Sequence, residues 1–288
     1  PDGILVVGDV DATLACALTA AKLGIRIAHV EAGLRCFDRS MPEEINRKLT
    51  DALADALFCT EASAVDNLRR EGVEESKIHW VGNVMIDTLM RRRQAARSSK
   101  IMERLGIREK QYAVVTLHRP SNVDDPSALA KMLDALQTLQ AETPLVFPAH
   151  PRTRRALREG GFEPRLSAMP GLIPIEPLGY LDFVRLLESA LAILTDSGGI
   201  QEEALALRVP CVTLRPSTER PATVESGGNR VAGGDPARIV EAFHQALRDS
   251  EEYRLPPLWD GHAAERIARI LAREWSKDIE GDKIGKDG

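Results

Sequence analysis

Carboxylates and histidines follow several short apolar runs in this sequence. Asp9 and Glu31 do so early in the chain, and His118, His150 and Asp196 do so further along. In open parallel sheets, ligands bind outside the carboxyl ends of the strands, and acids and imidazoles gathered there can transfer protons. Each residue alone would also suit an ordinary helix cap or turn. The five together predict an acid–base site without fixing any single role.

A glycine turn after the apolar run 192–195 gives the strongest local signal. Ser197, Gly198 and Gly199 follow this predicted strand and precede a predicted helix. Backbone N–H groups and the helix dipole at such a turn favour an anion such as a diphosphate, and the Ser197 hydroxyl could add a donor. Glu203, one turn into the helix, could accept hydrogen bonds from ribose hydroxyls. A plain capped turn is the alternative.

The loop after the next predicted strand carries Arg215 and Arg220. Two guanidinium groups near the same sheet edge suit phosphate contacts, although a solvated loop would have the same composition. Only Gly8 marks the first turn, so the G-x-G-x-x-G pattern of dinucleotide-binding proteins is absent, and so is the P-loop pattern. No His or Cys pair has zinc spacing. We therefore expect neither a nicotinamide cofactor nor a metal.

The composition of the 288 residues is that of a soluble globular protein, with 43% apolar and 28% charged residues. Net charge is −5 and aromatic residues make up 4%, which disfavours nucleic acid and anionic membranes as partners. The sequence shows no apolar run of membrane length and no signal peptide. The four cysteines lack metal or redox spacing and suggest reduced thiols. These features predict a cytoplasmic protein.

Short apolar runs alternate with amphipathic stretches, which is typical of βα units around parallel sheets. We expect an α/β fold with two Rossmann-like parallel-sheet lobes, over 1–95 and 110–255. A C-terminal helix within 256–277 could pack back on the first lobe, and a disordered tail would cover 278–288. Strands are predicted at 4–8, 26–30, 56–59, 78–81, 112–117, 144–148, 172–175, 191–195, 210–214 and 229–232. Helices are predicted at 11–23, 43–54, 61–71, 127–141, 152–159, 181–189, 199–207, 236–249 and 262–275.

Several segments together resemble the non-hydrolysing UDP-N-acetylglucosamine 2-epimerases, in order from about Gly8 to Ile270. The first two are His29-Val30-Glu31-Ala32-Gly33-Leu34-Arg35 and Pro42-Glu43-Glu44-Ile45-Asn46-Arg47. The others are Thr116 to Val123, Pro148 to Pro151, Glu176 to Tyr180, Asp196 to Glu203, Thr218 to Pro221 and Gly261 to Ile267. Taken together, these motifs are specific.

The resemblance implies a GT-B type fold with UDP held mainly by the second lobe. It implies interconversion of UDP-N-acetylglucosamine and UDP-N-acetylmannosamine, without cofactor or metal, in a homodimer. The catalytic residues that it implies are Asp9, Glu31, Glu43 and His118. The residues that it implies for substrate binding are Ser197, Gly198, Gly199, Glu203, Arg220 and His150. Glu44 is instead expected to pair with Lys48 or Arg47 on a helix surface.

The chain departs from the family pattern in two places. The family begins with a further βα unit carrying Gly-x-Arg-Pro, so we expect the first lobe to be incomplete at its N-terminus. Pro120-Ser121-Asn122 also stands where the family commonly has Glu before Asn, so allosteric regulation is not predicted either way. Three other functions stay open: a GT-B glycosyltransferase, an epimerase of a UDP-diacetamido-uronic sugar, and an inactive UDP-sugar-binding fragment.

Overall fold

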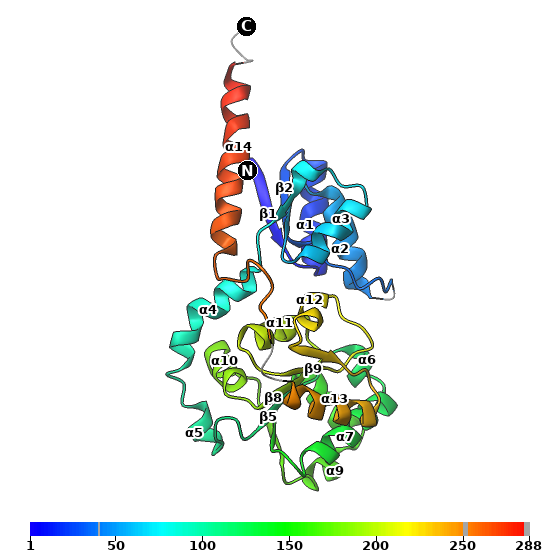
Figure 1. The fold of residues 1–288 in the computed structure, drawn as a ribbon. Coiled ribbons are helices and arrows are strands. Elements are labelled where there is room, and N and C mark those ends of the chain that lie inside the picture. The colour runs from blue at the N-terminus through cyan, green and yellow to red at the C-terminus, as the bar shows by residue number, and fades with distance from the viewer. Residues whose placement is uncertain (40, 250–252, 285–288) are drawn as a thin grey trace. The chain divides into compact units, whose positions relative to one another are not determined.

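The computed structural model describes residues 1–39, 41–249 and 253–284, with side chains up to residue 275. The chain forms two compact units, one of Pro1–Thr88 with Pro257–Gly288 and the other of Leu89–Pro256. Figure 1 shows the elements of each unit along the chain. Each unit is built on a parallel sheet, so the predicted α/β fold with two parallel-sheet lobes is confirmed.

The first unit contains a four-stranded parallel sheet in the order β1-β2-β3-β4. Ile27, Leu57 and Leu68 belong to the core on one face, and Val30 and Phe58 pack with α14 on the other. Its strands are β1 (Gly3–Val7), β2 (Arg26–Ala32), β3 (Ala56–Cys59) and β4 (Ile78–Trp80). Its helices are α1 (Asp11–Lys22), α2 (Pro42–Leu53), α3 (Ala62–Arg70), the 3₁₀ turn η1 (Glu75–Lys77) and α14 (Ala263–Ile284).

The second unit contains a six-stranded parallel sheet in the order β10-β9-β8-β5-β6-β7. Its strands are β5 (Ala113–Thr116), β6 (Leu145–Pro148), β7 (Leu172–Ile175), β8 (Ala192–Thr195), β9 (Cys211–Thr213) and β10 (Asn229–Val231). Helix α4 (Val84–Ala96) leads into it from the first unit. The helices that follow are α5 (Ile101–Leu105), α6 (Pro120–Val123), α7 (Pro126–Leu139), α8 (Pro151–Glu159), α9 (Glu163–Ser167), α10 (Tyr180–Glu188), α11 (Gly198–Ala206), α12 (Pro221–Glu225) and α13 (Pro236–Arg248).

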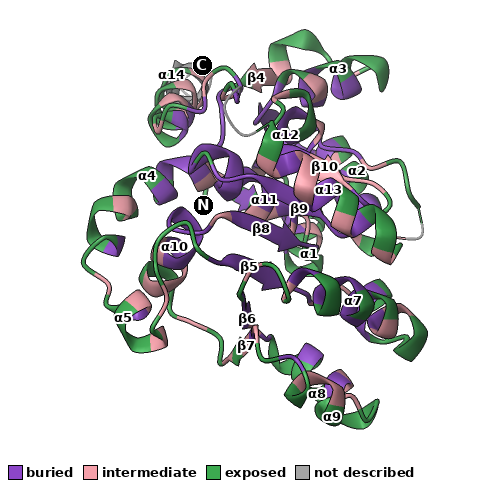
Figure 2. Ribbon diagram, turned by 60° about the horizontal axis from the view of Figure 1, so that its bottom comes forward, coloured by how far each residue is buried: buried purple, intermediate pink, exposed green. Residues whose placement is uncertain are grey.

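The central strands of the second sheet are β5 and β8, which are buried along their length (Figure 2). The chain runs outward from β5 through β6 and β7, and returns beside β5 as β8. The strand order therefore reverses between β5 and β8. In doubly wound sheets ligands bind at the carboxyl ends of the two strands that flank such a reversal. Here those ends lead to His118 and to Asp196.

All predicted strands and long helices are present in the structure, with small shifts at their ends. Helix α4 was not predicted, because its basic stretch lacks a clear apolar face. Arg93 in this helix and Arg97 directly after it both bind the Glu188 carboxylate. Helix α14 continues to Ile284, so the tail predicted over 278–288 begins inside this helix. The last four residues of that predicted tail lie outside the described residues. In the described part of the chain, no helix has both the length and the apolar character of a membrane span.

Candidate functional site

Asp9 lies on the turn that ends β1. Gly8 makes this turn with a φ of 72°, a left-handed conformation that suits glycine. The Asp9 carboxylate forms an ion pair of 2.5 Å with Arg47 of α2. Asn46, also on α2, donates a hydrogen bond of 2.9 Å to the Asp9 carbonyl. Helix α2 therefore fixes both the backbone and the side chain of Asp9.

Glu31 lies near the carboxyl end of the neighbouring strand β2, at the same sheet edge. Val7 and Val30 are paired across β1 and β2, so Asp9 and Glu31 follow strand positions in register. Glu31 has a φ of 69°, and the register with β3 shifts at this residue. A left-handed conformation costs a non-glycine residue free energy and is often found at functional sites. The structure thus brings these two predicted carboxylates to one edge of the first sheet.

Glu43 and Glu44 lie in the first turn of α2, where the helix dipole favours acidic residues. Glu43 is half-buried. Glu44 is fully buried and accepts hydrogen bonds from the Cys36 backbone and from Arg47. Burial alone would raise the pKa of Glu44, but these hydrogen bonds lower it. The prediction of an Arg47 partner for Glu44 was correct, whereas the prediction of a helix-surface position was wrong, because the 35–37 loop covers this carboxylate.

His118 and Asp196 meet at the reversal point of the second sheet. Asp196 is fully buried, and its Oδ1 lies 2.8 Å from His118 Nδ1. The same carboxylate accepts hydrogen bonds from the backbone N–H groups of His118 and Arg119 and from Asn122. Burial would raise the pKa of Asp196, but the hydrogen bond and charge of His118 lower it. Asp196 therefore orients the imidazole while remaining a carboxylate.

The glycine turn begins α11, with Ser197 as its N-cap residue. A Cβ atom on Gly198 would lie 2.4 Å from Glu219 Oε1, so a larger residue here would displace the Glu219 carboxylate. Glu219 binds Arg215 at 2.7 Å, and Arg220 lies 3.4 Å from Glu202. Arg220 is thus buried in an ion network beside the turn. This network places the Arg220 guanidinium near the N-terminus of α11, together with the Glu219 carboxylate.

A cavity of about 300 Å³ lies at the carboxyl ends of the central strands. His118, His150 and Ser197, all predicted site residues, line it. The rings of the two histidines are 6.2 Å apart between centroids. His150 also accepts a hydrogen bond from the Arg152 backbone as the N-cap of α8, so it is both a helix cap and a cavity residue. The remaining lining residues are Thr116, Leu117, Pro148, Pro177, Leu178, Phe183 and Ile200.

Glu203 lies one turn into α11 and is buried. Burial raises the pKa of its carboxyl group, and a hydrogen bond of 3.0 Å donated by the Tyr180 hydroxyl partly offsets this effect. A buried carboxylate with one hydroxyl donor has acceptor capacity for further hydroxyl groups. This arrangement fits the predicted contact with a ribose.

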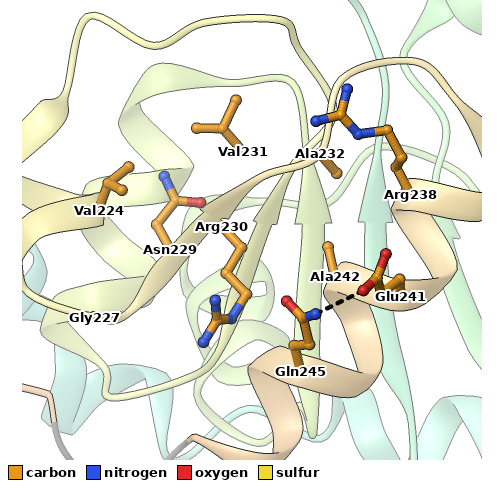
Figure 3. A pocket seen from close by; sticks show the side chains of 10 residues that line it. All are labelled: Val224, Gly227, Asn229, Arg230, Val231, Ala232, Arg238, Glu241, Ala242 and Gln245. Atoms are coloured by element: carbon orange, nitrogen blue, oxygen red, sulfur yellow. Dashed lines mark hydrogen bonds between the residues drawn. The ribbon is translucent and has the colours of Figure 1, made fainter.

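A second hollow of about 460 Å³ lies between β10 and α13 (Figure 3). Its lining among the described residues includes Arg230, Arg238 and Glu241, but none of the predicted site residues. Other contributors have roles that were not predicted, namely Arg47 as a partner of Asp9, Asn122, Tyr180 and Glu219. A signal existed for Arg47, which is three residues from Glu44 on one helix. The partners of Asn122 and Tyr180 are 74 and 23 residues away, beyond the reach of local patterns.

The chain is similar along almost its whole length to a known protein family. A family model described as UDP-N-acetylglucosamine 2-epimerase matches residues 1–272. A UDP-N-acetylglucosamine 2-epimerase of Methanococcus maripaludis is 41% identical over 95% of this chain and 76% of the relative. A UDP-2,3-diacetamido-2,3-dideoxy-D-glucuronate 2-epimerase of Pseudomonas aeruginosa is 41% identical over 95% of this chain and 75% of the relative.

Solved structures agree with these relatives. The crystal structure of Methanocaldococcus jannaschii UDP-GlcNAc 2-epimerase in complex with UDP-GlcNAc and UDP matches with a TM-score of 0.88 and 42% identity. The match covers 95% of this chain and 76% of that one. By family model, sequence identity and fold, the chain belongs to the UDP-N-acetylglucosamine 2-epimerase family.

Proposed function

We propose that this protein is an isomerase that interconverts UDP-N-acetylglucosamine and UDP-N-acetylmannosamine. The observation that carries the proposal is the 42% identity and 0.88 TM-score to an epimerase crystallised with UDP-GlcNAc and UDP. Independent support comes from the site geometry. The first sheet presents carboxylates at one edge, and the second unit has a histidine cavity next to a glycine turn.

The proposed reaction is an elimination followed by re-addition. The C2 proton of the sugar is not α to a carbonyl, so simple deprotonation would leave a high-energy carbanion. If a carboxylate takes this proton while the C1–O bond breaks, the electron pair forms the C1–C2 double bond and UDP leaves with the bond electrons. UDP then adds back to C1 while a proton returns to the opposite face of C2. The chemistry requires a base, an acid and a site for the departing diphosphate.

The acid–base groups in this proposal are Asp9, Glu31 and Glu43, with His118 completing the set. One of the carboxylates would take the C2 proton and another group would return it. Asp9 is paired with Arg47, and Glu31 occupies a strained backbone position. These different surroundings are a physical basis for different roles.

The groups that hold UDP would come from the second unit. The backbone of Ser197, Gly198 and Gly199 begins α11 and would bind the diphosphate. Glu203 would accept hydrogen bonds from the ribose. His150 lines the cavity, and Arg220 lies in the ion network beside the turn, so both would contact UDP.

One alternative substrate has specific support. The P. aeruginosa relative that is 41% identical is named for a UDP-diacetamido-uronic sugar. The elimination chemistry at C1 and C2 would be the same for that sugar, and the difference would lie at C3 and C6. Both sugars are therefore offered in the experiment below.

The test is incubation with each UDP-sugar in heavy water. Deuterium at C2 together with the 2-epimer supports the proposal. Free UDP without C2 label would indicate transfer or hydrolysis, and unchanged sugars would contradict the proposed activity. We expect Glu31→Gln to abolish exchange while UDP still binds, since that residue belongs to the first unit.

We also propose that the protein acts in the cytoplasm as a homodimer. Support for the compartment comes from its four cysteines, which are free thiols. Support for the dimer comes from the family resemblance. Sedimentation at micromolar concentration checks the oligomeric state.

A further inference from the structure

A cluster of four ionisable side chains is hydrogen-bonded to the backbone next to Asp9 and Glu31. His29 Nδ1 is 2.6 Å from Asp51 Oδ1, and Arg35 Nη1 is 2.7 Å from Asp51 Oδ2. Arg35 also binds Glu71 through two hydrogen bonds of 2.9 and 2.6 Å. The side chains of His29 and Arg35 are fully buried, and that of Asp51 is 2% exposed.

Both ring nitrogens of His29 face oxygen atoms. Its Nε2 lies 3.0 Å from the Gly8 carbonyl oxygen, which can only accept. Its Nδ1 faces Asp51, whose other oxygen accepts from Arg35 and from the Gly33 N–H group at 3.1 Å. An imidazole that donates from both nitrogens is a cation. With His29 charged, the cluster has two cations and two anions, whereas a neutral ring would leave Arg35 as the one cation of the cluster for the two carboxylates of Asp51 and Glu71.

This cluster connects two backbone turns. Gly8, whose carbonyl accepts from His29, directly precedes Asp9. Gly33, whose N–H donates to Asp51, follows Glu31 by two residues. Both glycines have positive φ, at 72° and 80°. A Cβ on Gly33 would lie 2.3 Å from the Ala64 carbonyl, so this turn is also held tightly against α3.

We infer that His29 and Asp51 are positioning residues for the epimerase reaction. The bond from His29 to Gly8 and the bond from Gly33 to Asp51 fix the two turns relative to one another, and with them the separation of Asp9 and Glu31. Both residues are buried, so they act through the carboxylates rather than by touching the sugar. The inference rests on the proposed function, because it takes Asp9 and Glu31 as the reacting acids.

A double-mutant cycle separates positioning from simple stabilisation. His29→Gln keeps one donor but removes the charge and the second bond. A displacement of about 1 Å can cost about 100-fold in rate, so we expect kcat for C2 exchange to fall about 100-fold, with KM changed less than about twofold. In an Asp9→Asn background, where the positioned group is already absent, His29→Gln should reduce the residual rate less than about threefold.

A matched control is His79→Gln. His79 lies on β4 of the same sheet and pairs with Glu274 at 3.4 Å, so this change should leave kcat as in the wild type. Unchanged kcat in His29→Gln, or an equal loss with and without Asp9, would overturn the inference. If His29→Gln does not fold, Asp51→Asn, which keeps the side-chain shape, replaces it in the same cycle.

A second readout does not depend on activity. The ¹H–¹⁵N spectrum of the wild-type protein should contain two slowly exchanging ring N–H signals that disappear in His29→Gln. A single ring signal would overturn the charged cluster. If the wild-type protein does not exchange deuterium into any offered sugar, the proposed function fails and the positioning role fails with it, while two ring signals would still establish the cluster itself.

Discussion

Asp196 accepts hydrogen bonds from both the backbone and the ring of His118, with 2.8 Å between Oδ1 and Nδ1. One buried carboxylate therefore fixes the histidine and the turn that carries it. The two residues are 78 positions apart in sequence and meet because β5 and β8 are neighbours. A carboxylate that holds the Nδ1 proton leaves Nε2 available for chemistry in the cavity.

Asp196→Asn tests this relationship. An amide has one acceptor oxygen and cannot serve all the donors that Asp196 now satisfies. We expect the C2 exchange rate to fall at least about 100-fold, the lower range for loss of acid–base catalysis. The control is Asp124→Asn in the same unit, where an exposed carboxylate pairs with Arg152. Full activity of Asp196→Asn would show that the imidazole needs no carboxylate partner.

Glu203→Gln should have opposite effects on binding and on stability. The carboxylate is proposed to accept from the ribose, and a hydrogen bond to a charged group contributes about 1.5–3 kcal/mol, so UDP affinity should fall about 10- to 100-fold. Burial raises the pKa of Glu203 above 4.5, so the folded state binds this proton more tightly than the unfolded state does. The free energy of unfolding should therefore decrease as pH rises from 4.5 through the raised pKa of Glu203.

It follows that Glu203→Gln should be more stable than the wild type at pH 7, with the gain vanishing below pH 4.5. Calorimetric titration with UDP and urea unfolding at several pH values provide the two measurements. Unchanged UDP affinity would remove Glu203 from the binding site, whatever the stability result.

The fold followed from patterns that the sequence carries locally, and the site followed only in part. Asp9, Glu31 and His118 could be placed at strand ends because apolar runs end just before them. The burial of Glu44 could not be predicted, since acids in the first turn of a helix are usually solvated. The His29–Asp51 pair joins residues 22 positions apart, and no periodic pattern encodes such a contact.

The ionised Glu219 carboxylate should stabilise the folded protein at neutral pH and lose this effect in acid. Burial would raise the pKa of its carboxyl group, but the hydrogen bond from Arg215 and the charges of Arg220 and Arg215 lower it to about 2. Because the folded pKa lies below the unfolded one, the stabilisation is complete above about pH 4.5 and is lost as pH falls toward 2. A shift of this size corresponds to about 3 kcal/mol at neutral pH.

Urea unfolding of wild type and Glu219→Gln checks this value. The two proteins should differ in their free energy of unfolding, and the pH-dependent part of this difference should be about 3 kcal/mol at pH 7 and about 1 kcal/mol at pH 3. Glu75→Gln, which breaks the exposed pair with Arg69, should show little change because solvent screens that pair. A difference that does not depend on pH would mean that Glu219 is not held ionised by its arginines.

The variants Gly33→Ala and Gly24→Ala test how tightly the turn after β2 is packed. Gly33 lies in that turn, and Gly24, which precedes β2, is the matched control. Both glycines have positive φ, so both alanines carry the left-handed penalty of about 1–2 kcal/mol. No atom lies within 4 Å of a Cβ on Gly24, whereas a Cβ on Gly33 would meet the Ala64 carbonyl at 2.3 Å. Thermal unfolding should therefore show a clearly larger loss of stability for Gly33→Ala than for Gly24→Ala. Equal losses would show that the Gly33 turn can move away from α3.

Glu31 offers a test of whether backbone strain accompanies the reacting carboxylate. Its φ of 69° is unfavourable for alanine and acceptable for glycine. Both Glu31→Gly and Glu31→Ala should abolish C2 exchange, but the glycine variant should be about 1 kcal/mol more stable than the alanine variant. At Val30, one residue earlier on β2, the order should reverse, because glycine weakens a regular strand. If glycine is the less stable replacement at both positions, Glu31 carries no strain and its backbone conformation is no sign of function.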